Sequence, residues 1–176
     1  RRLAQRAKAQ ESDIIVFPEL CLTGYPPEDL LFRPSLTPRI DEALASLADI
    51  RDIVLVLGYP KMVGGQLYNM AGAWLNGECL LEYAKQKLPN YQVFDEKRYF
   101  VEGNKSSVFT HKNVCIALTI CEDIWHHEPV AAAKALGAEL ILNLNASPFH
   151  INKQTERLST VQQHALNHQV SIAYVN

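Results

Sequence analysis

Three side chains that suit thiol chemistry each come just after an apolar, strand-like run in this sequence. They are a carboxylate (Glu19), an ammonium (Lys85) and a thiol (Cys121). Ser147 follows a fourth such run and adds a small polar group. In α/β sheets, groups beyond the carboxyl ends of the strands meet at one edge. We therefore expect these side chains to converge on one rim of the fold.

Cys121 is the candidate nucleophile. It stands at the end of a predicted strand and before a helix, where a turn holds a side chain rigidly and exposes it. A nearby ammonium lowers the pKa of a thiol, and an adjacent base accepts its proton. The alternative for any free cysteine is a structural role in packing. That alternative is our interpretation of the other three cysteines, which are Cys21, Cys79 and Cys115.

Glu19 and Lys85 have defined roles beside a reactive thiol. A carboxylate at position 19 can act as general base toward the thiol, and later as general acid toward an amine leaving group. Lys85 can supply a fixed positive charge to an oxyanion. A surface carboxylate and a solvated lysine are the alternatives, and Lys87 competes with Lys85 for the role.

A cysteine–histidine pair is the rival arrangement, because His126 and His127 follow Cys121 closely. Such pairs are common in hydrolases. Both imidazoles fall near a predicted helix start, which favours capping or surface roles. A metal site built from Cys121 and these histidines lacks a recognisable ligand spacing, so we expect no metal. No phosphate-binding or dinucleotide-binding fingerprint is present.

The elements that must position these residues alternate between helix and strand. Helices are expected at 1–11, 37–49, 129–137 and 151–168, and strands at 13–17, 53–57, 67–75, 79–83, 114–120, 140–144 and 171–175. We expect the strand at 53–57 to end at Gly58, and residues 85–105 to form a long functional loop. This order predicts an α/β layered domain whose sheet is covered on both faces. An open sheet does not easily begin at a helix, so we also expect a strand before Arg1.

The composition is that of an ordinary globular domain. The chain has 176 residues, of which 48% are hydrophobic and 20% charged, and its formal net charge is −2. This length suits one domain, and the charge balance predicts neither a nucleic-acid nor a membrane surface. The longest apolar runs are too short to span a bilayer. Four cysteines without a disulfide framework predict a reducing, cytoplasmic environment.

Four stretches of sequence carry a family resemblance: IIVFPELCLTGYPPEDLL, YAKQKLPNYQVFDEKRYF, ALTICEDIW and LILNLNASPF. They resemble the glutaminase domains of the glutamine-dependent NAD synthetases, in the nitrilase or carbon–nitrogen hydrolase superfamily. The resemblance covers nearly the whole chain. It implies a nitrilase-type αββα four-layer sandwich, incomplete at both ends. Residues 1–176 would form one amidohydrolase domain that lacks the first strand and the closing strands.

The resemblance also assigns site residues. The family's Glu–Lys–Cys triad matches Glu19, Lys85 and Cys121, and the motif KQKLP selects Lys85 rather than Lys87. The residues implied to bind the substrate are Tyr91, Glu96, Glu122, Ser147 and Lys153. Glu96 would position Lys85 and the substrate, and Glu122 would offer its backbone amide to an oxyanion. Packing beside the site is the alternative role for these residues.

The activity implied by the resemblance is hydrolysis of the side-chain amide of glutamine, which releases ammonia. A separate ATP-dependent synthetase domain of the same parent protein would use the ammonia to form NAD. ATP and Mg²⁺ are expected only in that domain, because this chain has no S-G-G-x-D-S loop, and no cofactor is expected here. Homo-oligomers are also implied. The alternatives are a stand-alone nitrilase-type amidase for another small amide, and a catalytically silent assembly domain.

Overall fold

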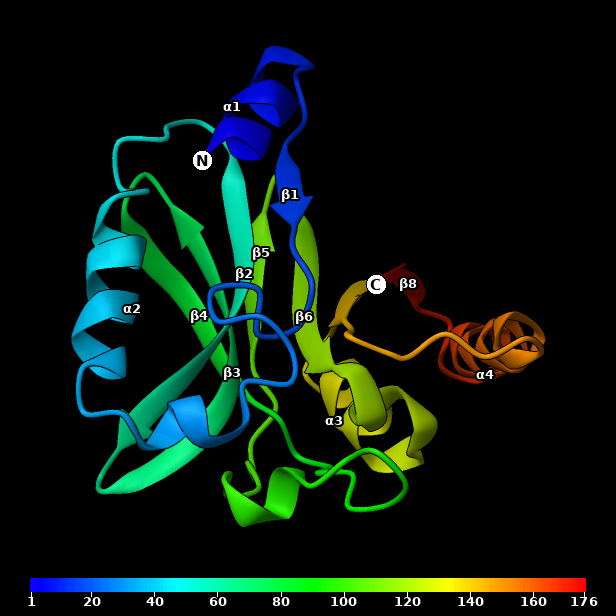
Figure 1. Cartoon of the computed structure of the whole chain (residues 1–176). Helices are drawn as coiled ribbons and strands as arrows, with labels where there is room; N and C mark the ends of the chain where they lie inside the picture. Colours follow the sequence, from blue (N-terminus) through cyan, green and yellow to red (C-terminus); the bar gives the residue numbers. More distant parts are fainter.

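Apolar runs form two four-stranded sheets that face each other (Figure 1). The computed structural model describes residues 1–176. The first sheet contains β1 (Ile14–Val16), β2 (Val54–Val63), β3 (Gln66–Leu75) and β4 (Glu78–Ala84), in that order. The second sheet contains β5 (Val108–His111), β6 (Val114–Ile120), β7 (Leu140–Leu144) and β8 (Ser171–Val175), in that order. β1 is parallel to β2, and β6, β7 and β8 are mutually parallel, whereas the other pairs are antiparallel.

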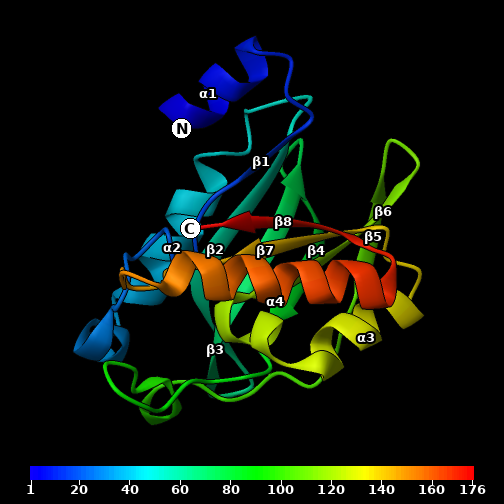
Figure 2. The same ribbon diagram turned by 90° about the vertical axis from the view of Figure 1, so that its right-hand side faces the viewer.

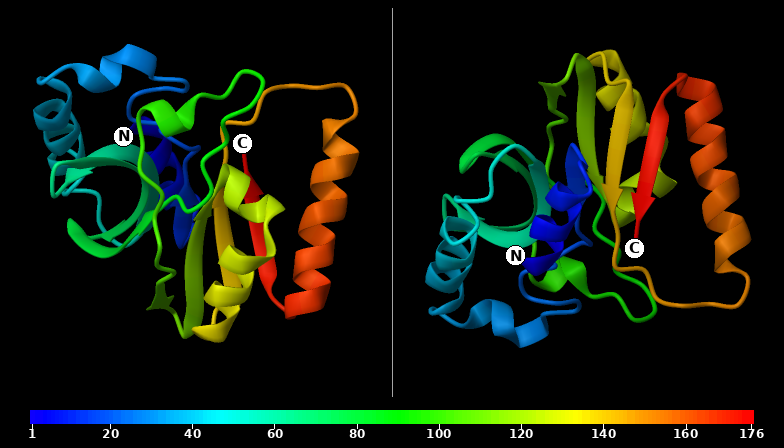
Figure 3. Two further views of the ribbon diagram at one scale, coloured as in Figure 1. Left: turned by 90° about the horizontal axis from the view of Figure 1, so that it is seen from below. Right: turned by 90° about the horizontal axis from the view of Figure 1, so that it is seen from above.

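Helices cover the outer face of each sheet. α1 (Arg2–Ala9) and α2 (Leu36–Ala45) pack on the first sheet, and α3 (His127–Ala135) and α4 (Lys153–His168) cover the second. α4 runs alongside β8 (Figure 2). The views from above and below show the helix–sheet–sheet–helix order (Figure 3). The predicted αββα sandwich is therefore confirmed. No helix combines the length and the apolar character needed to cross a membrane.

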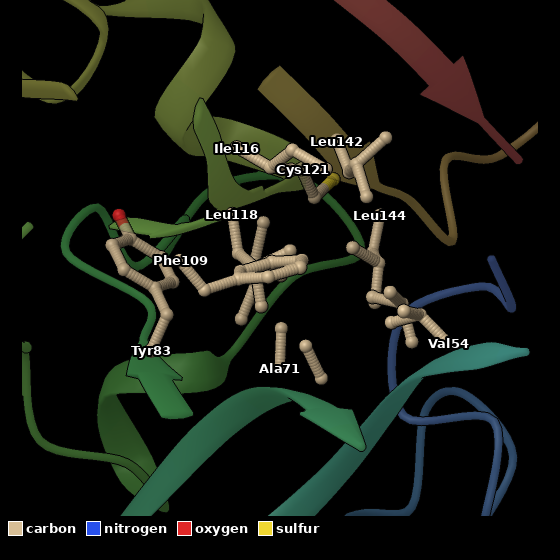
Figure 4. Packing of buried hydrophobic residues seen from close by; sticks show 12 residues of the cluster. Val54, Ala71, Tyr83, Phe109, Ile116, Leu118, Cys121, Leu142 and Leu144 are labelled. Atoms are coloured by element: carbon tan, nitrogen blue, oxygen red, sulfur yellow. The ribbon is translucent and has the colours of Figure 1, made fainter. Parts of the chain in front are cut away.

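The core between the sheets is a cluster of twelve buried residues, nine of which are labelled in Figure 4. Alternate side chains of β2 point to opposite faces, so Val54 and Val56 enter this cluster, whereas Leu55 packs under α2. Leu118 of β6 meets them from the second sheet. Burial of each large side chain stabilises the fold by about 1.5–3 kcal/mol. Cys121 is a member of the cluster, so the candidate nucleophile is anchored to the core.

β2 is longer than predicted, because Gly58 does not end it. The strand continues through Pro60 to Val63 and turns back into β3 at Gly64 and Gly65. A Cβ atom at position 58 would lie 2.4 Å from the backbone nitrogen of Leu20. Glycine inside a strand marks such a close approach between backbones. The prediction that Gly58 stops the strand was therefore wrong, and the residue instead admits the segment that carries Glu19.

The prediction of a single covered sheet was also incomplete. The strand β5 was not predicted, and it pairs antiparallel with β6 after a turn at Lys112 and Asn113, which both have positive φ angles. The predicted bounds of β6, β7 and β8 are confirmed. All four helices depart from their predicted bounds by a few residues. α1 ends at Ala9 rather than at residue 11, and α2 ends at Ala45 rather than at residue 49. α3 spans His127–Ala135 rather than 129–137, and α4 begins at Lys153 rather than at residue 151. The segment 85–105 is a loop apart from the short 3₁₀ helix η2 (Glu96–Arg98).

Candidate active site

Three strand ends deliver the predicted triad to one edge of the sandwich. Glu19 follows β1 after Pro18, Lys85 is the first residue after β4, and Cys121 is the first residue after β6. β1 is parallel to β2. β4 also points the same way as β2, because β3 is antiparallel to both β2 and β4. The carboxyl ends of β1 and β4 therefore lie at the same edge of the sheet, as expected from the sequence.

Lys85 lies between two carboxylates and has no exposed surface. Its Nζ donates to Glu19 Oε1 at 2.7 Å and to Glu96 Oε1 at 2.7 Å. Glu19 is 2% exposed and Glu96 is 5% exposed, so all three charges are removed from water. A buried charge is costly unless it is paired and hydrogen-bonded. Here the two carboxylates stabilise the ammonium, and the ammonium holds them together.

Further hydrogen bonds fix the orientation of Glu19. Asn69 Nδ2 donates to Glu19 Oε1 at 2.8 Å, and the backbone nitrogen of Ala146 donates to Glu19 Oε2 at 3.1 Å. The backbone carbonyl oxygen of Asn69 also accepts the backbone N–H of Lys85 at 2.9 Å. Asn69 was not predicted from the sequence, although a polar amide inside the otherwise apolar centre of β3 is a detectable signal.

Glu96 is held from a second direction by Tyr25. The Tyr25 hydroxyl donates to Glu96 Oε1 at 2.8 Å, which brings a loop after β1 onto the loop after β4. Glu96 contacts Lys85, which fits its predicted role in positioning the lysine. It does not line the cavity that contains Cys121 but a separate one of about 320 Å³ beside Tyr25. Tyr25 was also missed, because nothing in the local sequence links it to position 96.

The buried charges shift the pKa values of the site. Burial alone would lower the pKa of Lys85, but the charges of Glu19, Cys121 and Glu96 outweigh it and raise the pKa. Burial raises the pKa of Glu96 despite the charge of Lys85. Burial and then the charge of Glu19 raise the pKa of the Cys121 thiol, and Lys85 only partly opposes them. These shifts favour the thiol over the thiolate at Cys121.

Cys121 occupies a sharp turn between β6 and the 3₁₀ helix η3 (Cys121–Trp125). Its φ angle is 44°, in the left-handed region that a residue with a Cβ atom rarely adopts. Such strain persists where the surrounding structure imposes it, and it is common at functional sites. Cys121 Sγ lies 3.7 Å from Ser147 Oγ, and the Tyr174 hydroxyl lies 3.1 Å from that same oxygen.

The thiol opens onto a cavity of about 570 Å³. This cavity is lined by four of the five predicted substrate-binding residues, which are Tyr91, Glu122, Ser147 and Lys153. The Tyr91 hydroxyl donates to Glu122 Oε2 at 2.8 Å. Lys153 Nζ lies 4.4 Å from the centre of the Trp125 ring and 2.8 Å from Glu156 Oε2. The cavity wall thus carries both positive and negative groups.

The rival residues lie elsewhere. Lys87 Nζ is 3.5 Å from Glu128 at the surface, and it takes no part in the buried cluster. His126 lies 3.5 Å from Glu122, and the His127 ring packs 4.8 Å from the His168 ring. Neither imidazole is hydrogen-bonded to the thiol. No group of three His, Cys, Asp or Glu side chains is arranged to hold a metal ion.

The sequence profile of the carbon-nitrogen hydrolase family matches residues 1–176, which is the whole chain. The chain belongs to the carbon-nitrogen hydrolase family. The strands, the buried lysine and the strained cysteine described above are therefore features of a member of this family, and the resemblance found in the sequence is confirmed.

Relatives of this carbon-nitrogen hydrolase include enzymes named glutamine-dependent NAD(+) synthetase. The protein from Acinetobacter baylyi is 41% identical over 174 residues, which cover 98% of this chain and 32% of the relative. The protein from Xanthomonas campestris is 43% identical over 170 residues, which cover 94% and 31%. The chain thus spans about a third of the length of the curated relatives it matches.

Solved structures show the same similarity to enzymes of this family. The glutamine-dependent NAD+ synthetase from Acinetobacter baumannii superimposes with a TM-score of 0.97 at 41% identity, covering 99% of this chain and 34% of the other. An amidase of Nesterenkonia sp. AN1, in which acrylamide has added to the active-site cysteine, gives a TM-score of 0.86 at 28% identity, with coverage of 98% and 68%. This carbon-nitrogen hydrolase is accordingly a cysteine amidohydrolase.

Proposed function

We propose that this carbon-nitrogen hydrolase hydrolyses the side-chain amide of glutamine through a thioester on Cys121 and releases ammonia. The observation that carries the proposal is the Lys85 ammonium, buried between Glu19 and Glu96 beside the thiol. The names of the relatives support glutamine as the substrate. The mixed charges of the cavity suit an amino acid, because its ammonium and its carboxylate both need partners.

Glu19 is the base in the first step. It takes the thiol proton from Cys121, and the sulfur attacks the amide carbon of the substrate. Lys85 has three N–H donors, and its two carboxylate partners occupy two of them. The third donor is free for the oxyanion of the tetrahedral intermediate, together with the backbone N–H of Glu122. Such pre-placed donors stabilise the charge that develops in the transition state.

Glu19 then returns the proton to the nitrogen of the leaving group. The carbon–nitrogen bond breaks, ammonia departs, and a γ-glutamyl thioester remains on Cys121. A water molecule, activated by Glu19, attacks the thioester carbon, and the Cys121 sulfur leaves as the thiol. Glutamine and water are thereby converted into glutamate and ammonia. Tyr91, Ser147 and Lys153 would hold the substrate in the cavity while Glu96 holds Lys85.

The role in the parent protein is a further part of the proposal. A separate synthetase domain, with ATP and Mg²⁺, would consume the ammonia to form NAD, and this agrees with the names and the greater length of the relatives. Assembly into homo-oligomers stays a prediction, to be checked by sedimentation of the intact protein. A stand-alone amidase is the second candidate, because the Nesterenkonia amidase shares the fold closely.

The test is release of glutamate and ammonia from glutamine by the intact protein. We expect Cys121→Ala to abolish both products, because Cys121 is the one thiol that lines the cavity. Cys115→Ala is the matched control, since Cys115 lies on β6 outside the cavity and its loss should leave the rate unchanged.

Three outcomes would contradict the proposal. Glutamine hydrolysis that survives Cys121→Ala would exclude the thioester route. Faster Cys121-dependent hydrolysis of propionamide than of glutamine would instead favour the stand-alone amidase. If wild-type protein is folded but hydrolyses neither amide, with ATP and the other synthetase substrates supplied, the silent assembly domain is favoured.

A further inference from the structure

Asp123 is a fully buried carboxylate that the mechanism above does not use. It lies in η3, two residues after the nucleophile. Its two oxygens accept four hydrogen bonds. Oδ2 accepts from the Tyr83 hydroxyl at 2.8 Å and the Ile120 backbone nitrogen at 2.9 Å, and Oδ1 accepts from the backbone nitrogens of Gln86 at 3.0 Å and Lys87 at 2.8 Å.

The position of these donors in the chain is informative. Three of them belong to the segment 83–87, so they flank Lys85 on both sides. The fourth belongs to Ile120, which directly precedes Cys121. One carboxylate therefore joins the backbone that carries the ammonium to the backbone that carries the thiol. These two segments belong to different sheets, and no other single side chain is hydrogen-bonded to both.

Asp123 forms no salt bridge, so its charge is stabilised mainly by these four donors. Burial raises its pKa to about 6, although the hydrogen bonds from Ile120 and Tyr83 oppose the shift. Both oxygens of the carboxyl group accept hydrogen bonds, and three of the four donors are backbone N–H groups. Burial of a carboxylate without a salt-bridge partner is costly compared with burial of an apolar side chain. We therefore expect the Asp123 carboxylate to have a role that an apolar side chain could not perform.

We propose that Asp123 is a positioning residue that holds the Lys85 ammonium and the Cys121 thiol at a fixed separation. The proposal rests on the proposed function, because it assigns Lys85 to the oxyanion and Cys121 to the attack. Tyr83, which packs in the core between the sheets (Figure 4), anchors the carboxylate from the β4 side. Misplacement of catalytic groups by about 1 Å can lower a rate on the order of 100-fold.

Two variants separate positioning from simple loss of charge. Asp123→Asn keeps the shape of the side chain but turns an amide N–H₂ toward backbone N–H donors. This loosens the connection between the backbone segments that carry Lys85 and Cys121. Tyr83→Phe removes one of the four hydrogen bonds and changes no charge. If this connection between the two segments loosens, Lys85 moves away from the thiol and the pKa of Cys121 rises. Loss of the Asp123 charge alone would favour the thiolate, and the pKa of Cys121 would fall.

Tyr59→Phe is the matched control. Tyr59 and Tyr83 are each 1% exposed, and each donates a hydroxyl proton to a carboxylate. The partner of Tyr59 is Glu82, at 2.7 Å, which does not contact the triad. A purely structural role for the Tyr83 hydroxyl would make both phenylalanine variants alike in activity and in thermal stability.

The experiment measures two quantities in the intact protein and in each variant. The first measurement gives kcat and KM for glutamine hydrolysis. The second gives the pH midpoint for alkylation of Cys121 by iodoacetamide, which is monitored by mass spectrometry. We expect Asp123→Asn to lower kcat about 100-fold with little change in KM, by misplacement of the reacting groups. Its alkylation midpoint should move to higher pH. Tyr83→Phe should show the same changes more weakly, and Tyr59→Phe should show neither.

Several outcomes overturn the proposal. The first is that folded Asp123→Asn keeps the wild-type kcat and alkylation midpoint. The second is that its midpoint moves to lower pH. The third is that Tyr83→Phe and Tyr59→Phe lose equal amounts of activity. If Asp123→Asn does not fold, Tyr83→Phe decides, and wild-type values there overturn the proposal. If wild-type protein does not hydrolyse glutamine, the proposed function fails, but the alkylation midpoints still test the positioning role.

Discussion

At the scale of single residues, Lys85 is the side chain on which the others depend. Its ammonium is fully buried and contacts both Glu19 and Glu96 at 2.7 Å. Removal of the ammonium would leave two adjacent carboxylates buried without a cation, which is strongly unfavourable. The same change would remove the charge that opposes the raised pKa of Cys121. Lys85 thus couples the stability of the site to its chemistry.

We expect Lys85→Ala to lower kcat/KM for glutamine by about 100-fold or more, as for loss of an oxyanion donor. Lys87→Ala is the matched control, because its ammonium pairs with Glu128 at the surface and its backbone N–H to Asp123 is retained. Steady-state kinetics check the pair, with circular dichroism to confirm folding. An inactive Lys87→Ala beside an active Lys85→Ala would show that the wrong lysine has been assigned.

The raised pKa of Cys121 makes a prediction about stability and pH. The thiol ionises near 9.0 in the unfolded chain but only at higher pH when folded, because burial and Glu19 disfavour the thiolate. Between these values the unfolded state binds fewer protons, so the free energy of unfolding falls as pH rises. The loss from this thiol is about 1.4 kcal/mol per pH unit. Urea unfolding between pH 8 and pH 11, a range of about three units, should therefore show a steeper decline for wild type than for Cys121→Ser. Parallel curves would contradict the raised pKa.

At the scale of elements, the meeting of β2 with the segment after β1 determines where Glu19 lies. The hydrogen bond from Leu22 N to Gly58 O, at 3.2 Å, holds the two backbones together. A Cβ atom at position 58 would meet the backbone of Pro18, Glu19 and Leu20 at 3.0 Å or less. These are backbone atoms rather than the ends of flexible side chains, so the segment itself would have to move.

We expect Gly58→Ala to lower stability by about 1–3 kcal/mol through overpacking, and to lower kcat as well because Glu19 is displaced. Gly72→Ala is the control, because its Cβ would meet the side chains of Tyr59 and Trp74 in the same sheet. Urea unfolding and glutamine kinetics would be measured for both variants. The interpretation fails if the two variants lose equal stability and Gly58→Ala keeps the wild-type kcat.

At the scale of the whole molecule, each sheet supplies half of the site. The first sheet carries Glu19 and Lys85 beyond its strand ends, and the second carries Cys121 and Ser147. The core between the sheets (Figure 4) therefore fixes the distance between base and nucleophile as well as the stability of the fold. Protein cores are close-packed, so a change in volume there is transmitted to the surroundings.

We expect Leu118→Ala to lower the free energy of unfolding by about 2–5 kcal/mol, since it removes a 1% exposed side chain from this core. Leu80→Ala is the control, because Leu80 is 37% exposed on β4, and its loss should cost about 0.5 kcal/mol or less. Urea unfolding of both variants provides the measurement. Similar losses in the two would show that the space between the sheets is not the principal core.

The sequence by itself determined the features that are local in the chain. Uniform apolar runs bounded by turn residues predicted β6, β7 and β8 correctly, because strand formation there follows from side chains a few residues apart. The positions of Glu19, Lys85 and Cys121 after their strands were predicted for the same reason. The family motifs then selected Lys85 over Lys87, and the structure places Lys85 alone of the two beside Glu19.

Only the tertiary structure decided the contacts between distant segments. The bond from Asn69 to Glu19 joins residues 50 apart in sequence, and the bond from Tyr83 to Asp123 joins residues 40 apart. Gly58 was misinterpreted for the same reason, because its function depends on a backbone that approaches from another segment. A one-dimensional pattern records which side chains can be buried but not which partners they meet. The hydrogen-bonded surroundings of the triad therefore follow from how the two sheets pack.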